Sequence, residues 1–215
     1  SEKGNQTSKR FFFDLGVSSM QFDKGYKGFS FSKDGPLDMR MDPEDDVTAK
    51  EIVNRFSEQK LGEIFREYGE EPHWKKAARA IVEARHKKPI ETTHQLAALL
   101  MSAIGFKRGG KLHPATLVFQ ALRIVVNKEL DAIQNGLTRA LSFMAHGSRA
   151  GAISFHSLED RLVKNIFRTA CQRTKKDGPA EFMKLLTKKP LAPTFAEIRM
   201  NPRSRSAKMR FVERT

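Results

Sequence analysis

The chain has 215 residues, of which 39% are apolar, enough to bury the core of one large domain or two small ones. Lysine and arginine number 39 against 25 aspartates and glutamates, so the formal net charge is +14. A charge of this size favours an anionic partner such as nucleic acid, although a generally basic soluble surface would also account for it. No apolar run reaches the length of a membrane span, so no membrane partner is expected.

Cysteine and histidine usage narrows the class of protein further. Cys171 is the only cysteine, which excludes an internal disulfide and a zinc site built on cysteines. We therefore expect a reducing compartment: the cytoplasm or, in a eukaryote, a mitochondrion or plastid. The six histidines include no pair at metal-ligand spacing, so no metal site is predicted.

The first predicted element is a short buried strand over Phe11–Phe13, ending in Asp14 and a turn. Three consecutive phenylalanines are too few for a helix, and Gly16, Ser18 and Ser19 interrupt the apolar run. Open α/β sheets bind ligands at such an edge, which makes these residues candidates for a site. The alternative is a structural strand followed by a solvated turn.

A second loop, over residues 28–43, is dense in glycine, proline and carboxylates. Its charged residues either shape a cleft or lock the loop through turns of their own. These residues are Asp34, Asp38, Arg40 and Asp42.

From about Thr48 to Phe106 the apolar residues recur every three or four positions, which predicts helices with one buried face. We interpret residues 44–112 as an all-helical domain inserted into an α/β domain. Lys75, Lys76 and Arg79 are candidates for gripping RNA phosphates, with Tyr68, His73 and Trp74 stacking on bases. The alternative is that Trp74 anchors the helical core and the cations form a solvated helix face.

The remaining sequence predicts a helix over 113–135, a second helix through Leu137 and Phe143, and a strand over 150–155. A further helix then begins, with Ser157 and Asp160 in an N-cap arrangement. Segments 184–191 and 208–213 are expected to form an antiparallel strand pair. The loop between them contains Arg203 and Arg205, two further candidates for RNA binding.

Taken together, these segments resemble the ribosomal RNA small-subunit methyltransferase H family, also called MraW. The resemblance covers nearly the whole chain after residue 9. The motifs that carry it are Asp14-Leu-Gly-Val-Ser-Ser19, Gly28-Phe-Ser-Phe31, Asp34-Gly-Pro-Leu-Asp-Met-Arg-Met-Asp42, Tyr68-Gly-Glu-Glu71, His113-Pro-Ala-Thr116, Phe119-Gln-Ala-Leu-Arg-Ile124, Val126-Asn127 with Glu129-Leu130, Ser154 to Arg161, and Asn201-Pro-Arg-Ser-Arg-Ser-Ala-Lys208.

The resemblance implies methyl transfer from S-adenosylmethionine to the exocyclic amine of a cytidine in the decoding region of small-subunit ribosomal RNA. The partner would be that RNA or the ribosomal subunit, and a homo-oligomer is left open. The fold would be the C-terminal part of a doubly wound Rossmann-like methyltransferase sheet, formed by residues 1–43 and 113–215, with the helical insertion over 44–112.

Candidate site residues follow from the positions that match the family. Asp14 and Gln21 would contact S-adenosylmethionine, and Ser18 and Ser19 would line the same edge. Residues after the next strand would position the target base, or would merely cap a helix and pair with Arg161. They are His156, Ser157, Glu159 and Asp160.

The chemistry agrees with these residue types. The lone pair of the cytosine amine is delocalised into the ring, so an enzyme must orient the amine and accept hydrogen bonds from its protons. The base must also leave its stack. Methylation of a ring carbon generally needs a cysteine nucleophile, and Cys171 lies in a sequence typical of a helix end. Amine methylation needs no covalent intermediate.

The family has a strand and a Gly-x-Gly-Gly-His loop ahead of the segment matched here, and that loop holds the amino-acid end of S-adenosylmethionine. The paired glycines Gly109 and Gly110 follow no strand and lie in a basic loop instead. Two hypotheses result. The chain is the C-terminal two thirds of an rRNA methyltransferase, or it is a non-catalytic RNA-binding ribosome assembly factor derived from one.

Overall fold

The computed structural model describes residues 10–16, 27–106, 112–173 and 183–215. The chain divides into two compact units. The sheet unit contains residues 1–16 and 130–215, and the helical unit contains residues 17–129. Within the described ranges, no helix combines the length and apolar composition needed to cross a membrane.

The sheet unit is built on one mixed sheet with the strand order β1-β2-β4-β3. β1 and β2 run parallel, whereas β4 runs antiparallel to both of its neighbours, β2 and β3. The strands are β1 (Arg10–Asp14), β2 (Arg149–Ser154), β3 (Met183–Leu185) and β4 (Lys208–Arg214). The expected antiparallel pair is therefore confirmed, although β3 is shorter than predicted. Beyond β3 the pairing continues as an isolated bridge between Leu191 and Met209.

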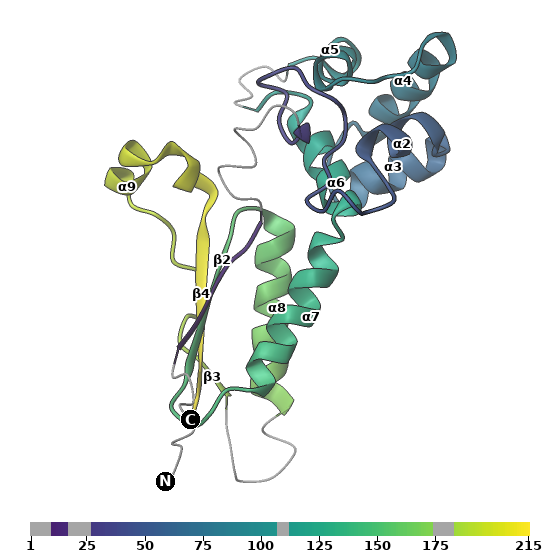
Figure 1. The fold of residues 1–215 in the computed structure, drawn as a ribbon. Coiled ribbons are helices and arrows are strands. Elements are labelled where there is room, and N and C mark those ends of the chain that lie inside the picture. Colours follow the sequence, from purple (N-terminus) through teal and green to yellow (C-terminus); the bar gives the residue numbers. More distant parts are fainter. Residues whose placement is uncertain (1–9, 17–26, 107–111, 174–182) are drawn as a thin grey trace. The chain divides into compact units, whose positions relative to one another are not determined.

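Helices α7 (Glu129–Ser142) and α8 (Ser157–Arg173) run along the sheet, as Figure 1 shows. Ala150 and Ala152 of β2 are small enough to let a helix approach the sheet closely, and both are buried. Val163 and Phe167 of α8 are buried in the same cluster. Apolar burial of this kind is the main favourable contribution to the stability of the unit.

The prediction that the first strand is buried is wrong for one of its faces. Phe11 and Phe13 pack against the core cluster, but Phe12 points to the opposite face and is 59% exposed. Successive side chains of a strand alternate between faces, so a run of three phenylalanines cannot enter one core together. On the outer face Phe12 and Phe211 flank Gly151, where an added Cβ would lie 2.5 Å from the Phe211 ring.

The helical unit is a bundle of short helices, and side chains cap the starts of α2 (Ala49–Arg55), α3 (Glu58–Glu67) and α5 (Thr93–Ile104). Thr48 and Thr92 each form a capping box, with Glu51 and Gln95 respectively. Ser57 accepts a hydrogen bond from the N–H of Lys60. The other helices are α4 (Trp74–Lys87) and α6 (Thr116–Val126).

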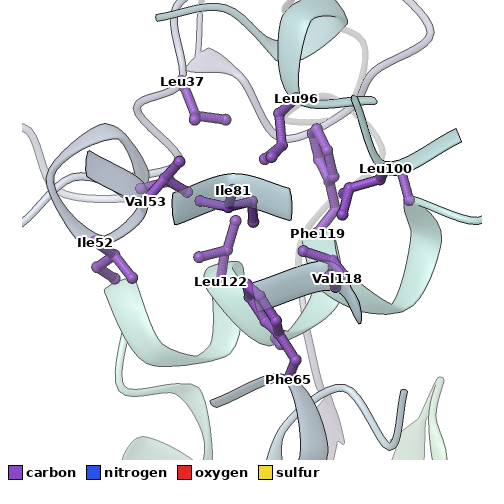
Figure 2. Close-up of a cluster of buried hydrophobic side chains, with 14 of the residues drawn as sticks. Leu37, Ile52, Val53, Phe65, Ile81, Leu96, Leu100, Val118, Phe119 and Leu122 are labelled. Carbon is purple, nitrogen blue, oxygen red and sulfur yellow. The ribbon is translucent and has the colours of Figure 1, made fainter. Parts of the chain in front are cut away.

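The core of this unit draws on all of these helices and on the loop before them. Figure 2 shows the side chains converging, with Leu37 from the loop among them. The labelled residues are Leu37, Ile52, Val53, Phe65, Ile81, Leu96, Leu100, Val118, Phe119 and Leu122. The helical unit thus includes residues 27–43 and α6, which the sequence analysis assigned to the sheet domain.

The Asn127 side chain ties α6 to the loop before α2, and it lies where the structure interrupts a helix that the sequence predicted as continuous. The predicted helix over 113–135 is interrupted at Asn127 and Lys128, where Lys128 has a φ of 49°. The Asn127 side chain accepts a hydrogen bond from the N–H of Met41 at 2.7 Å and donates to the carbonyl of Met39 at 2.8 Å. It also donates to the carbonyl of Arg123 at 2.9 Å, so one amide joins the end of α6 to the loop.

Asn127→Ala is expected to lower the free energy of unfolding by about 2–4 kcal/mol, because it removes three hydrogen bonds and leaves backbone groups without a partner. Urea denaturation measures the change. The control is Asn135→Ala on the exposed side of α7, which should change stability by less than about 0.5 kcal/mol. Equal effects of the two substitutions would contradict the role assigned to Asn127.

Candidate active site at the carboxyl end of β1 and β2

Parallel pairing brings the carboxyl ends of β1 and β2 to the same edge of the sheet. Asp14 lies opposite Ile153, and the N–H of Leu15 donates to the carbonyl of Ile153 at 3.0 Å. Asp14 is exposed. Its carboxylate therefore stands at the kind of edge where α/β sheets bind ligands.

The turn after β1 requires glycine. Gly16 has a φ of +85°, a conformation that other residues adopt at a cost. A Cβ at this position would lie 3.2 Å from the Oε1 atom of Glu159 and 3.9 Å from the ring of Phe155. The end of β1 thus lies directly against the residues that join β2 to α8.

Glu159 organises that junction. Its side chain has no exposed surface, and its Oε2 atom accepts hydrogen bonds from the N–H groups of Phe155 at 2.7 Å and His156 at 3.4 Å. In return the Glu159 N–H donates to Nδ1 of His156 at 3.4 Å. The pattern is that of a capping box, with histidine in the place usually taken by serine or threonine.

The cap is therefore one residue earlier than predicted. α8 begins at Ser157, which leaves His156 at the cap position and Glu159 three residues later. The His156 side chain is only 11% exposed, and its Nε2 atom lies 3.2 Å from Oε1 of Glu159. This geometry supports the capping alternative for Glu159 and leaves the exposed Ser157 nearer to solvent.

Asp160 is held by β4 instead. Its carboxylate makes a bidentate pair with Arg210, at 2.7 and 3.0 Å, and lies 3.6 Å from Nζ of Lys208. Burial alone would raise the pKa of Asp160, but hydrogen bonds from Arg210 and the charges of Arg210 and Lys208 outweigh it. The pKa therefore lies below its ordinary value of 3.8.

Three of the predicted site residues, Ser18, Ser19 and Gln21, lie outside the described residues. Their assignments stay predictions.

The acidic loop of the helical unit is locked mainly by its own contacts. Arg40 pairs with Asp38 at 2.8 Å and also donates to the carbonyls of Pro43 and Asp45. The hydrogen bonds from Arg40 hold the pKa of Asp38 below its ordinary value. These contacts favour the interpretation that the loop braces itself.

The aromatic candidates of the helical unit also have structural partners. Trp74 packs against the core cluster, and a Cβ added at Gly62 would lie 2.8 Å from its ring. The Arg66 guanidinium and the Lys75 ammonium lie 5.4 and 5.2 Å from the ring centroid. Trp74 is therefore a core anchor with cations beside it, which supports the alternative weighed for it.

The basic candidates remain exposed. Lys75 and Lys76 project from α4, while Arg79 is 3.7 Å from the carboxylate of Glu58. Arg203 and Arg205 lie on the 3-10 helix η2 (Pro202–Ser206), in the sheet unit, and both are exposed.

A groove of about 580 Å³ lies elsewhere in the sheet unit, between α7, α8 and the neighbouring strands. It is lined partly by Met183 and Arg214, which are paired at the start of β3 and the end of β4. Because β4 is antiparallel to β2, the end of β4 lies beside the start of β2. Met183 and Arg214 are therefore at the opposite end of the strands from Asp14. The groove is therefore separate from the candidate site.

One residue of the site, Arg210, was missed by sequence reasoning. Arg210 pairs with Asp160 across 50 positions of sequence, so no local pattern connects them. A signal for its burial was nevertheless present. Arg210 and the apolar Val212 are two positions apart in the predicted strand 208–213, so their side chains lie on the same face, and both are buried.

These features define a mixed α/β protein with acidic and helix-starting residues gathered at the carboxyl edge of a parallel strand pair. The chain belongs to the MraW methylase family, whose sequence profile it matches over residues 1–215. The resemblance inferred from the motifs is thereby confirmed.

Curated relatives of the chain carry the name "Ribosomal RNA small subunit methyltransferase H". The relative from Protochlamydia amoebophila is 50% identical over 203 residues, covering 90% of this chain and 64% of the relative. That from Carboxydothermus hydrogenoformans is 48% identical over 209 residues, or 94% and 67% of the two chains. That from Picosynechococcus is 51% identical over 201 residues, or 93% and 65%. The chain thus spans about two thirds of the length of these relatives.

Asp160→Asn is expected to lower the free energy of unfolding at pH 7 by about 2–4 kcal/mol, because it leaves the Arg210 guanidinium buried without its carboxylate. Since folding lowers the pKa of Asp160, the ionised carboxylate stabilises the protein above its ordinary value of 3.8. That stabilisation is lost as the pH falls through the folded-state pKa.

Urea unfolding of both proteins over a pH series measures this difference. The difference in the free energy of unfolding should have its full size at pH 7 and shrink at acidic pH. The exposed control Asp131→Asn should change the free energy of unfolding little at any pH. A difference that stays constant down to the acid limit would show that the charge of Asp160 is not what stabilises the fold.

Proposed function

We propose that this chain forms part of a methyltransferase that transfers a methyl group from S-adenosylmethionine to the exocyclic amine of a cytidine. The cytidine would lie in the decoding region of small-subunit ribosomal RNA. The observation that carries the proposal is the exposed carboxylate of Asp14 at the carboxyl end of β1, beside the start of α8. Family membership and the names of the relatives support it.

The residues at this edge fit the methyl donor chemically. S-adenosylmethionine supplies an electrophilic methyl group on a positively charged sulfonium. An exposed carboxylate such as Asp14 favours a positive ligand and accepts hydrogen bonds from its polar groups. Gly16 lets the chain turn away directly after Asp14, which keeps the strand end accessible. We assign Asp14 and Gln21 to binding the donor, and Ser18 and Ser19 to the same edge.

The start of α8 would form the wall that receives the base. Ser157 is exposed on the first turn, and His156 precedes it, so both are assigned to positioning the target base. Glu159 acts through the cap: its hydrogen bonds to the backbone fix the direction in which His156 and Ser157 leave the strand. Holding the amine in one orientation lowers the entropic part of the barrier to transfer.

RNA would be held by basic side chains of both units. The sheet unit is proposed to be part of a doubly wound Rossmann-like methyltransferase sheet, and the helical unit an RNA-binding insertion. The exposed Lys75 and Lys76 of α4, with Arg79, are assigned to phosphate contacts in the helical unit. Arg203 and Arg205 are assigned to the same task in the sheet unit. The alternative function is a non-catalytic RNA-binding ribosome assembly factor, which would need these contacts but no methyl donor.

Asp14→Ala should lower the affinity for S-adenosylmethionine by at least about tenfold, because a charge-assisted hydrogen bond is lost. Isothermal titration calorimetry on the native-length protein measures the affinity. The matched control is Asp131→Ala, which removes an exposed carboxylate from α7 and should leave the affinity unchanged. Unchanged binding by Asp14→Ala would remove that residue from the site, and no binding by any form would favour the assembly factor.

Replacing both Lys75 and Lys76 with Glu should weaken binding to small-subunit RNA. The slope of the logarithm of the binding constant against the logarithm of the salt concentration should become shallower by about 0.7 for each lost phosphate contact. Filter binding at several salt concentrations measures both quantities. Replacing Lys87 and Lys88 with Glu makes the same change in net charge at the far end of α4 and serves as the control. Equal losses for both pairs would mean that charge alone, and not this helix face, determines binding.

A further inference from the structure

The segment that joins β3 to β4 has no buried residue, and after Leu191 it leaves the sheet. We call residues 186–207 the excursion. It contains α9 (Phe195–Met200) and η2, and neither of these helices has a buried residue. Figure 1 shows α9 standing away from the strands, beyond the start of β4.

The excursion ends at the same end of the sheet as the candidate site, although its first residue, Leu186, is still paired with Phe211 in the middle of β4. Lys208, the first residue of β4, lies opposite Ser154, the last residue of β2. The Ser154 hydroxyl donates to the carbonyl of Lys208 at 3.3 Å. Asp14 and the start of α8 lie at this same end of the sheet, on β1 and after β2.

Local hydrogen bonds hold the excursion in place. Leu191 and Met209 exchange two backbone hydrogen bonds of 2.9 Å, which tie its first part to β4. Glu197 accepts hydrogen bonds from the N–H of Thr194 at 2.6 Å and from its hydroxyl at 2.8 Å, closing a capping box on α9. Six residues are too few for a helix to be stable alone in water. Because α9 has no buried residue, the capping box rather than core packing stabilises it.

The side chains that the excursion presents are large, apolar and positively charged. Phe195 is 92% exposed and Met200 is 84% exposed. Its sequence has five lysines and arginines against one glutamate, a net charge of 5 − 1 = +4. The five cations are Lys188, Lys189, Arg199, Arg203 and Arg205.

An exposed aromatic ring among cations has the chemistry that binds single-stranded nucleic acid. Every base offers a face on which an aromatic ring can stack, and the neighbouring phosphates attract lysine and arginine. The charge of the excursion therefore favours RNA over an uncharged apolar partner.

We propose that the excursion is an RNA-docking element of the active-site edge. Phe195 stacks on an unpaired base next to the target nucleotide, while Arg199, Arg203 and Arg205 bind the adjacent phosphates. The identity of the RNA rests on the proposed function, but the docking itself does not require methyl transfer.

The test compares Phe195→Ala with Phe143→Ala. Phe143 is also largely exposed, at 70%, but it precedes β2 and so lies toward the opposite edge of the sheet. Fluorescence anisotropy measures binding to a labelled single-stranded RNA of about 12 nucleotides, and to an abasic strand of the same length and charge.

Phe195→Ala should weaken RNA binding by about 5- to 150-fold, the effect of one lost stacking contact. It should leave binding to the abasic strand unchanged, and Phe195→Trp should retain the affinity for RNA. Phe143→Ala should change neither affinity. Replacing Arg203 and Arg205 with Ala should weaken binding to both strands, because phosphates are present in each.

Equal RNA affinities of the Phe195→Ala and Phe143→Ala variants would overturn the proposal, as would a failure of the unmodified protein to bind RNA. Sedimentation analysis adds a further arm: a dimer that Phe195→Ala dissociates without loss of RNA affinity would assign the excursion to a second copy of the chain. Failure of the methyltransferase proposal is recognised separately, by absent binding of S-adenosylmethionine while the Phe195 effect on RNA persists.

Discussion

The candidate site depends on one buried carboxylate. Glu159 accepts hydrogen bonds from the backbone N–H groups of Phe155 and His156, and its other oxygen lies against Gly16. It thereby joins the end of β1, the end of β2 and the start of α8 in one contact. A buried carboxylate is costly unless hydrogen bonds compensate it, so its environment must keep this geometry. Asp14, His156 and Ser157 all lie within a few residues of this junction.

A second contact extends the same edge to β4. The pair between Asp160 and Arg210 joins the first turn of α8 to β4, the strand that follows the excursion. The adjacent carboxylates of α8 thus have different partners. Glu159 binds the backbone at the end of β2, and Asp160 binds Arg210 of β4. The edge combines a rigid base with exposed groups, namely Asp14, Ser157 and the excursion. Rigid support beneath exposed functional groups is what positioning a ligand requires.

Much of this edge could be predicted from sequence because its signals are local. The acid after an apolar run located the end of β1, and the segment from Ser154 to Arg161 located the start of α8. Long-range contacts could not be predicted. The amide of Asn127 interrupts a continuous helical pattern because it bonds to a loop 86 residues away. Likewise, the cap lies at His156 because Glu159 accepts hydrogen bonds from the backbone N–H groups of Phe155 and His156, whereas Asp160 pairs with Arg210, 50 residues away.

The most direct test of the account is to follow the methyl group. The native-length protein would be incubated with S-adenosylmethionine carrying a labelled methyl group and with small ribosomal subunits that lack the modification. The RNA would then be digested and its nucleosides separated by mass. The account predicts label on the exocyclic amine of a cytidine. Label on a ring carbon or on another nucleoside, or no label while the RNA is still bound, would contradict it.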